Sequence, residues 1–226
     1  SGTPENADVG GHGVVLRVTD GSEAFEVQSF IITVENTNDA PVFTSEAITE
    51  ATEDEEYSYT VIAEDVDIGD EIVLSTVLLP SWLSFVDNGD GTGILSGTPL
   101  NEHVGSHGLI LVVTDGTETV QEPLIIAVEN TNDAPIFTSE AVTAATEDVN
   151  YIYSVTADDV DAGDELVITA STIPEWLQLV DNGDGTGELS GTPENADVGG
   201  HGVVLRVTDG SEAFEVQSFI VTVENT

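Results

Sequence analysis

Short runs in which apolar and polar positions alternate recur along the whole chain, separated by glycine, aspartate, asparagine and proline. In one stretch the runs are PVFTS (41–45), YSYTVIA (57–63), EIVLSTV (71–77), WLSFV (82–86), GILS (93–96), GLILVVT (108–114) and LIIAV (124–128). They are rich in β-branched and aromatic residues and show no helical period, which favours β-strands. About seven strands in ~95 residues are typical of a Greek-key sandwich. We therefore predict an all-β fold of tandem seven-stranded Greek-key β-sandwiches.

The same alternation predicts which side chains form the core. The predicted core residues are Phe43, Tyr59, Val61, Trp82, Leu83, Leu109, Leu111, Val113 and Ile125, with their equivalents in the other copies. The stretch SEAFEVQSFIITV (22–34) is one residue longer than its equivalent TETVQEPLIIAV (117–128), and its apolar phase shifts. An insertion combined with a phase change predicts a β-bulge.

Internal repetition sets the predicted domain organisation. Residues 1–37 match residues 190–226 at every position except Ile32, which is Val221 in the later copy. We expect the C-terminal half of a repeat over 1–37 and full repeats over 38–131 and 132–226. The half repeat presents an apolar face that needs partners, which leaves two explanations. Either the chain is a window of a longer tandem protein, or a neighbouring copy donates the missing strands.

The charge balance narrows the class of partner. The chain carries 44 acidic side chains against two basic ones, Arg17 and Arg206, and its formal charge is −42. Such a charge repels nucleic acid and anionic membrane surfaces and favours cations. No apolar run approaches the ~18 residues that a membrane span needs, so membrane insertion is not expected. The chain has no cysteine, so disulfides and thiolate metal sites are excluded.

Several recurring motifs carry a resemblance to a known family. ENTNDAPVF (35–43) resembles the inter-domain linker of cadherin repeats, and AEDVD (63–67) and VTDG (113–116) resemble two further cadherin motifs. PSWLSF, GTGILSGTP and VGSHGLILVVTDG are closer to the dystroglycan-type cadherin-like modules, also called putative Ig modules, of large bacterial surface proteins. The resemblance implies calcium at the linkers and places a ligand at Glu53. The Asp-Arg-Glu motif of typical cadherins is absent, which implies fewer calcium ions at each junction and weaker binding.

The residues themselves support the same kind of site. In a sandwich the aspartates after two strands and the acidic linker enter at one end, so their carboxylates should meet there. Calcium takes six to eight oxygen ligands of this kind. The candidate ligands at the first junction are Glu35, Asn38, Asp39, Asp65, Asp67 and Asp115. Those at the second junction are Glu129, Asn132, Asp133, Asp159, Asp161 and Asp209, with Glu53 from the preceding repeat. The alternative is a solvated cluster of acidic loops that binds no ion.

Other motifs have structural interpretations that we favour. DNGDGTG (87–93 and 181–187) predicts a β-hairpin turn, because Asn-Gly and Asp-Gly accept positive φ. The alternative there is an auxiliary ion at Asp87 or Asp90. The recurring histidines His12, His107 and His201 are expected to be caps or core-edge residues rather than metal ligands. Trp82 and Trp176 are expected to anchor the core rather than to stack on sugars.

We therefore expect a non-catalytic, extracellular segment of a tandem-repeat protein, secreted or attached to a bacterial surface. Calcium at the linkers would stiffen it into a stalk or filament, for example in a biofilm matrix. The alternative is a calcium-dependent adhesion module that binds polysaccharide or a partner surface protein. Its main partners would be neighbouring repeats of the same chain and possibly other copies in a fibre. Acidic pairs that recur in every repeat argue against an enzyme, which would normally have a single site.

Overall fold

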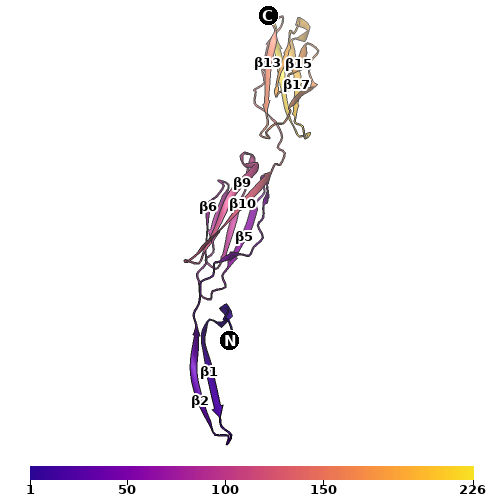
Figure 1. Cartoon of the computed structure of the whole chain (residues 1–226). Helices are drawn as coiled ribbons and strands as arrows, with labels where there is room; N and C mark the ends of the chain where they lie inside the picture. The colour runs from indigo at the N-terminus through magenta and orange to yellow at the C-terminus, as the bar shows by residue number, and fades with distance from the viewer. The chain divides into compact units, whose positions relative to one another are not determined.

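The computed structural model describes the whole chain, Ser1–Thr226, which divides into two compact units, Ser1–Glu129 and Asn130–Thr226. Apart from three short 3-10 turns, all its regular structure is β-strand, which confirms the predicted fold class. The turns are η1 (Asn6–Asp8), η2 (Asn101–His103) and η3 (Asn195–Asp197). The first unit holds a hairpin and one β-sandwich, and the second unit holds one β-sandwich (Figure 1).

Eight strand segments build the sandwich of the first unit. They are β3 (Val42–Phe43), β4 (Glu50–Thr52), β5 (Tyr57–Glu64), β6 (Val73–Leu78), β7 (Leu83–Asp87), β8 (Thr92–Gly97), β9 (Gly105–Thr114) and β10 (Thr119–Glu129). One sheet has the order β4-β10-β9-β6 and the other has the order β3-β5-β8-β7. The strand predicted over 41–45 shortens to β3, which pairs with β5. Strand β4, which pairs with β10 in the opposite sheet, was not predicted from the sequence.

The second unit has the same topology. Its strands are β11 (Ile136–Phe137), β12 (Ala144–Thr146), β13 (Tyr151–Asp158), β14 (Val167–Thr172), β15 (Leu177–Asp181), β16 (Thr186–Gly191), β17 (Gly199–Thr208) and β18 (Phe214–Glu224). The two sheets have the orders β12-β18-β17-β14 and β11-β13-β16-β15. The two sandwiches are therefore copies of one architecture.

Each sandwich encloses its own core between its two sheets. Every second side chain of β5 faces inward, so that Tyr57, Tyr59 and Val61 are buried while the residues between them are exposed. Trp82 packs edge-on against Tyr57, with the ring centroids 5.7 Å apart. Edge-to-face contact is a preferred arrangement of aromatic pairs, so Trp82 anchors the core as predicted.

The predicted core position of Ile125 is wrong. Ile125 is 64% exposed, whereas the next residue, Ile126, is fully buried. Leu124 and Val128 also pack against the core, so the even-numbered residues of β10 face inward. The run LIIAV has apolar residues side by side, and alternation alone therefore leaves its inward face undetermined.

The predicted β-bulge is also wrong. The hairpin strands β1 (Gly10–Thr19) and β2 (Phe25–Val34) pair in one continuous register, and so do β17 and β18. The additional residue lies in the turn, which covers 209–213 in the second unit but only 115–118 in the first. The register shifts occur elsewhere, between β6 and β9 and between β14 and β17.

The phase change that suggested a bulge has a different cause. In β18 the partly buried positions next to the core hold Glu215 and Gln217, and the exposed positions hold Phe214 and Val216. Glu215 accepts a hydrogen bond from the backbone N–H of Phe137 over 2.6 Å. Polar side chains thus face inward where they have partners, and the apolar pattern of the sequence appears inverted there.

The DNGDGTG stretch forms the predicted hairpin turn between β7 and β8. Gly89 and Gly91 have positive φ angles of 74° and 79°. The Asp87 carboxylate accepts hydrogen bonds from the backbone N–H groups of Leu74 and Gly89. Asp90 Oδ1 accepts from both the N–H and the hydroxyl of Thr92. These aspartates therefore fix the turn through their hydrogen bonds.

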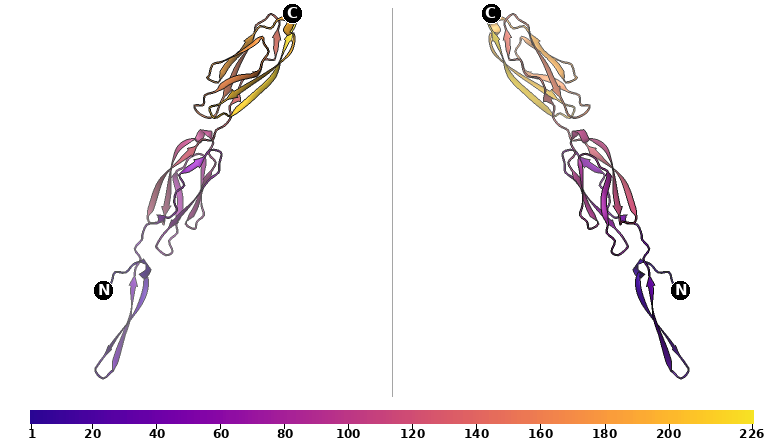
Figure 2. Two further views of the ribbon diagram at one scale, coloured as in Figure 1. Left: turned by 90° about the vertical axis from the view of Figure 1, so that its right-hand side faces the viewer. Right: turned by 90° about the vertical axis from the view of Figure 1, so that its left-hand side faces the viewer.

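The β1–β2 hairpin exposes a face that the second unit buries. Leu16 is 53% exposed and Val18 is 69% exposed, whereas their counterparts Leu205 and Val207 are fully buried. Both views of the ribbon show the hairpin without a second sheet over either face (Figure 2). Because the two segments are almost identical in sequence, the presence of the opposite sheet alone decides the burial.

The matched leucines give a direct test of this difference. Leu205→Ala should lower the unfolding free energy of the second unit by about 2–5 kcal/mol, the usual cost of truncating a buried leucine. Leu16→Ala, in the same local sequence, should change stability by less than about 0.5 kcal/mol, as exposed substitutions do. Urea unfolding of both variants measures the effect.

A fusion serves as the control. Placing a second copy of residues 132–189 ahead of Ser1 recreates a full repeat around the hairpin, because 1–37 and 190–226 match. In that fusion Leu16→Ala should become as costly as Leu205→Ala. Equal costs in the unfused chain would mean that the hairpin face is already covered.

Candidate metal centre

The loop after β13 brings three aspartates of the second unit together. Asp159 and Asp161 follow the end of the strand, and Asp164 lies further along the same loop. One carboxylate oxygen from each lies within 4.8 Å of the others. The backbone N–H of Asp161 donates to Asp159 Oδ1 over 2.9 Å, which holds the Asp159 carboxylate against the loop.

The segment before β11 adds two further polar residues at the same place. The N–H of Asp133 donates to Asp161 Oδ2 over 2.7 Å. Asn132 Nδ2 donates to Asp209 Oδ2 over 2.9 Å. Asp209 follows β17, and its other oxygen accepts two backbone N–H groups of the turn. The second unit thus gathers all five of its predicted ligands at one end of the sandwich.

Three buried carboxylate oxygens in this cluster have no hydrogen-bond partner. They are Asp159 Oδ2, Asp161 Oδ1 and Asp164 Oδ2. Asp161 is only 6% exposed, and burying a charged group without a partner is costly. A set of carboxylate and amide oxygens is the donor set that Ca²⁺ prefers. The residues present therefore fit a calcium ion.

The first unit repeats this arrangement. Asp65, Asp67 and Asp70 form the matching cluster, again with oxygens within 4.8 Å of one another. The Asp39 N–H donates to Asp67 Oδ2 over 2.7 Å. Asn38 Nδ2 donates to Asp115 Oδ2 over 2.9 Å. Two copies that differ in several loop residues thus keep the same hydrogen bonds between linker and loop.

The electrostatics of the two clusters show how crowded the carboxylates are. Burial raises the pKa of Asp159, and the negative charges of Asp161, Asp164 and Asp209 add to this increase. Desolvation and neighbouring aspartates likewise raise the pKa of Asp70. Each acid therefore binds its proton more tightly in the folded than in the unfolded chain. Ionisation of these residues destabilises the fold as pH rises through the raised pKa values.

Basic side chains do not relieve the crowding. The chain has no lysine, and its two arginines are Arg17 and Arg206. Their guanidinium groups lie over the rings of Phe25 and Phe214, at 4.0 and 3.8 Å from the ring centroids. Hydrogen bonds oppose the crowding at Asp115, where the N–H of Glu118 and the amide of Asn38 hold the pKa below its ordinary value.

Asp70 and Asp164 are members of the clusters that the sequence interpretation missed. Each is the fourth acidic residue of the repeated stretch EDVDIGDE or DDVDAGDE. The cadherin-like motif covers only Asp65 and Asp67, or Asp159 and Asp161, and the loop that follows has no strand periodicity to place a further ligand. Repetition of the acid in both copies was the available signal.

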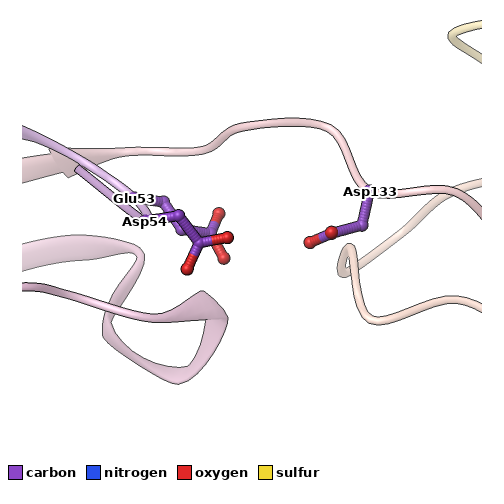
Figure 3. Close-up of side chains that lie close together, drawn as sticks. All are labelled: Glu53, Asp54 and Asp133. Carbon is purple, nitrogen blue, oxygen red and sulfur yellow. The ribbon is translucent and has the colours of Figure 1, made fainter.

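The predicted glutamates are not members of either three-aspartate cluster. Glu53 is 1% exposed and follows β4, at the end of the sandwich where β5 begins, and its N–H donates to the Glu129 carbonyl over 2.9 Å. Figure 3 shows its carboxylate beside that of Asp54. Glu129 itself ends β10 and is exposed. Glu35 follows β2 and lines a hollow together with Thr37 and Asp39.

The second unit contains an equivalent of Glu53 that the sequence interpretation also missed. Glu147 is 7% exposed and accepts hydrogen bonds from the Thr226 N–H and hydroxyl, over 3.1 and 2.7 Å. The tripeptide TED at 52–54 and 146–148 was the signal in the sequence. A buried glutamate therefore receives the last residues of its own repeat, at the end opposite to the aspartate cluster.

Comparison with known protein families identifies the family to which these repeats belong. The family described as "Putative Ig domain" matches residues 40–129 and 134–224, well over half of the chain. The chain belongs to the putative Ig domain family. Comparison with curated proteins returned no similar sequence.

Solved cadherin ectodomains share the fold of these Ig-type repeats. PcdhgB3 EC1-4 superposes with a TM-score of 0.69 at 19% identity, over 100% of this chain and 60% of that one. Protocadherin Gamma B2 extracellular cadherin domains 1-5 give 0.59 at 16% identity, over 96% and 46%. The human Desmocollin-1 ectodomain gives 0.53 at 14% identity, over 96% and 47%. Identities this low show the fold alone.

The first similar structures are longer than this chain. It spans 35% of the endo-fucoidan hydrolase MfFcnA4 from glycoside hydrolase family 107, at 25% identity, and the TM-score of 0.42 is too low to bear on fold or function. Tandem repeats of the putative Ig domain family fit a structural or adhesive module. No helix of the chain has the length and apolarity to span a membrane.

The histidines and tryptophans of the Ig-type repeats have structural contacts. His107 Nε2 lies within hydrogen-bonding distance of the His103 carbonyl oxygen, and His201 Nε2 makes the same contact with Asp197. Trp176 packs edge-on against Tyr151. These contacts agree with the predicted roles as caps and core anchors.

Removing one charge from the crowded loop should stabilise the second unit when divalent cations are absent. In chelator, Asp164→Asn should raise the unfolding free energy by about 1–4 kcal/mol, since like charges ~4 Å apart repel by about 1 kcal/mol at a water-like dielectric and about 4 kcal/mol at an effective dielectric of 20. Calorimetry in EDTA measures the shift of the melting temperature. Glu175→Gln removes an exposed charge elsewhere in this unit and should have almost no effect. A destabilised Asp164→Asn would show that this carboxylate makes net favourable contacts.

Proposed function

We propose that this chain is a non-catalytic structural segment of an extracellular tandem-repeat protein, in which calcium at the linkers between repeats stiffens the chain into an extended stalk or filament. The observation that carries the proposal is the recurring cluster in which a linker asparagine and aspartate meet the aspartates of the following loops. Buried carboxylate oxygens without partners in that cluster support a cation there.

The proposed ligands at the first junction lie on three segments. The linker supplies Glu35, Asn38 and Asp39, and the following sandwich supplies Asp65, Asp67 and Asp115. Asp70 joins this set because its carboxylate lies with Asp65 and Asp67. Calcium accepts six to eight oxygens in a flexible geometry, and this donor set is large enough to provide them.

The second junction repeats the proposal with equivalent residues. Glu129, Asn132 and Asp133 belong to the linker, and Asp159, Asp161, Asp164 and Asp209 belong to the following sandwich. Glu53 is proposed as the ligand from the preceding repeat. It is almost fully buried and sits next to the last residue of β10, which is the position from which a linker-bound cation would be reached.

A bound divalent cation supplies positive charge that the side chains lack. At an effective dielectric of 20, two carboxylates ~4 Å apart repel by about 4 kcal/mol. Without the cation, repulsion favours separation of the linker from the loops. With the cation, the carboxylates attract a common centre, so the linker loses its freedom to hinge. The stiffness of the chain thus depends on the calcium concentration.

Repetition favours a structural role over a catalytic one. The same hydrogen bonds connect linker and loop in both units, at Asp39–Asp67 and at Asp133–Asp161. In repeat proteins each repeat contacts chiefly its neighbours, so length grows by duplication. A mechanical joint is needed once per repeat, and the clusters occur at that frequency.

Calcium binding and its location can be tested with one pair of variants. Calcium at about 100 times its Kd should stabilise the wild-type chain by about 2.7 kcal/mol, which is roughly 10–20 °C in melting temperature for a small domain. Asp133→Ala combined with Asp161→Ala should abolish the increase in the second unit. Glu175→Ala combined with Glu188→Ala removes the same charge from exposed positions and should preserve it. An increase that survives the first pair would place the ion elsewhere.

Small-angle scattering tests the mechanical part of the proposal. The maximum dimension of the wild-type chain should increase when calcium replaces chelator, and the Asp133→Ala, Asp161→Ala variant should respond less. An unchanged maximum dimension at saturating calcium would contradict stiffening even if calcium binds. Glycan-array binding with and without calcium separates a stalk from an adhesive module.

A further inference from the structure

Asn6 makes a contact at the first junction that the proposed ligand set does not include. It begins the η1 turn and is half-buried. Its amide Nδ2 lies 2.8 Å from Asp39 Oδ2 and 3.3 Å from Asp67 Oδ1. One neutral amide from the preceding half repeat therefore bridges a carboxylate of the linker and a buried carboxylate of the following sandwich.

The oxygen that Asn6 contacts, Asp67 Oδ1, is one of the buried carboxylate oxygens of the site that need a hydrogen-bond partner. Asp67 is 5% exposed, and its Oδ2 is already occupied by the Asp39 N–H. In the second unit the equivalent oxygen, Asp161 Oδ1, is buried without a hydrogen-bond partner. The Asn6 amide thus satisfies, in the first unit, an atom that the second unit by itself leaves unsatisfied.

The asparagine recurs at one position of the repeat. It is the sixth residue of SGTPEN at 1–6, of SGTPLN at 96–101 and of SGTPEN at 190–195. Neighbouring positions vary, since Glu5 and Asp8 are replaced by Leu100 and His103 in the middle copy. In the third copy Asn195 is exposed, whereas Asn6 next to a linker is half-buried. The amide therefore becomes enclosed where a linker and an aspartate loop follow it.

A side-chain amide can serve such a site both with and without a bound cation. It carries two donor hydrogens on nitrogen and an acceptor oxygen at almost the same distance from the backbone. With no cation present, the NH₂ group donates to the two carboxylates and partly replaces the missing positive charge. Turning the amide by half a revolution places its oxygen where the nitrogen was. Neighbouring oxygens around Ca²⁺, at 2.3–2.6 Å from the ion, are about 3–3.5 Å apart, close to the two distances observed.

We propose that the Asn6 amide oxygen is a calcium ligand that the preceding repeat contributes to the first junction, with its NH₂ group bridging Asp39 and Asp67 in the ion-free chain. The inference rests on the proposed function and extends it to the SGTP-x-x segments, because Asn101 occupies the same position before the second junction. A neutral residue serves here better than an acid, since a further carboxylate would increase repulsion in the ion-free chain.

The test is a calcium titration of the full chain by isothermal calorimetry, with variants at one residue. Asn6→Ala removes the oxygen and should raise the Kd of one set of sites by about tenfold or more, a typical effect of losing a supporting group at a metal site. Asn6→Asp keeps an oxygen but loses the NH₂ donor, and should bind calcium at least as tightly as the wild type. If Asn6 only donates hydrogen bonds, Asn6→Asp should bind as weakly as Asn6→Ala.

Two control variants match these changes. Ala7→Asp adds the same charge one residue further along, and a change in Kd below about twofold shows that charge alone does not explain Asn6→Asp. Asn195→Ala removes the equivalent amide where no linker follows in this chain, and should leave all affinities unchanged. Equal effects of Asn6→Ala and Asn195→Ala would overturn the assignment.

A spectroscopic measurement reads the amide directly. In ¹⁵N-labelled chain the side-chain NH₂ signals of Asn6, identified by their loss in Asn6→Ala, should shift when calcium is added. Signals that stay in place while other junction signals shift would overturn the inference and leave the proposed function intact. If the wild-type chain takes up no calcium in the titration, the proposed function itself fails.

Discussion

Carboxylates that the fold forces together, in a chain without lysine, are the constraint on which the junctions depend. The order of the strands brings the loop after β13, the turn after β17 and the linker to one end of the sandwich, and each carries aspartate. Backbone N–H groups satisfy some of their oxygens, but several buried oxygens remain without partners. Protons or cations that neutralise such a cluster stabilise it. Calcium is the cation we propose, because carboxylate and amide oxygens are the ligands it prefers.

The fold was largely predictable because its signals are local. Alternation identified every long strand, and the turn residues of DNGDGTG gave the β7–β8 hairpin. Errors arose where local signals are ambiguous or misleading. The adjacent apolar residues of LIIAV hid that Ile126 rather than Ile125 faces the core. Glu215 and Gln217 face inward, and these polar residues produce the change of apolar phase that a bulge would also produce. They can face inward because their hydrogen-bonding partners come from distant segments.

The candidate site was predicted in part for the same reason. Residues that belong to a recognisable motif, such as Asp133 and Asp161, were found, and the structure brings them into contact. Asp164 sits beyond the motif in an irregular loop, and Asn6 is neutral and far away in sequence. Only the folded arrangement shows that their side chains reach the cluster. Likewise, identical strands bury Leu205 and expose Leu16, because burial depends on the opposite sheet.

The most direct measurement is anomalous X-ray diffraction from crystals of the chain grown in millimolar calcium. The account predicts anomalous density surrounded by the carboxylates of Asp133, Asp159 and Asp161, with a second peak at Asp39, Asp65 and Asp67. Ordered carboxylates with no density between them, in crystals that contain calcium at that concentration, would contradict the account.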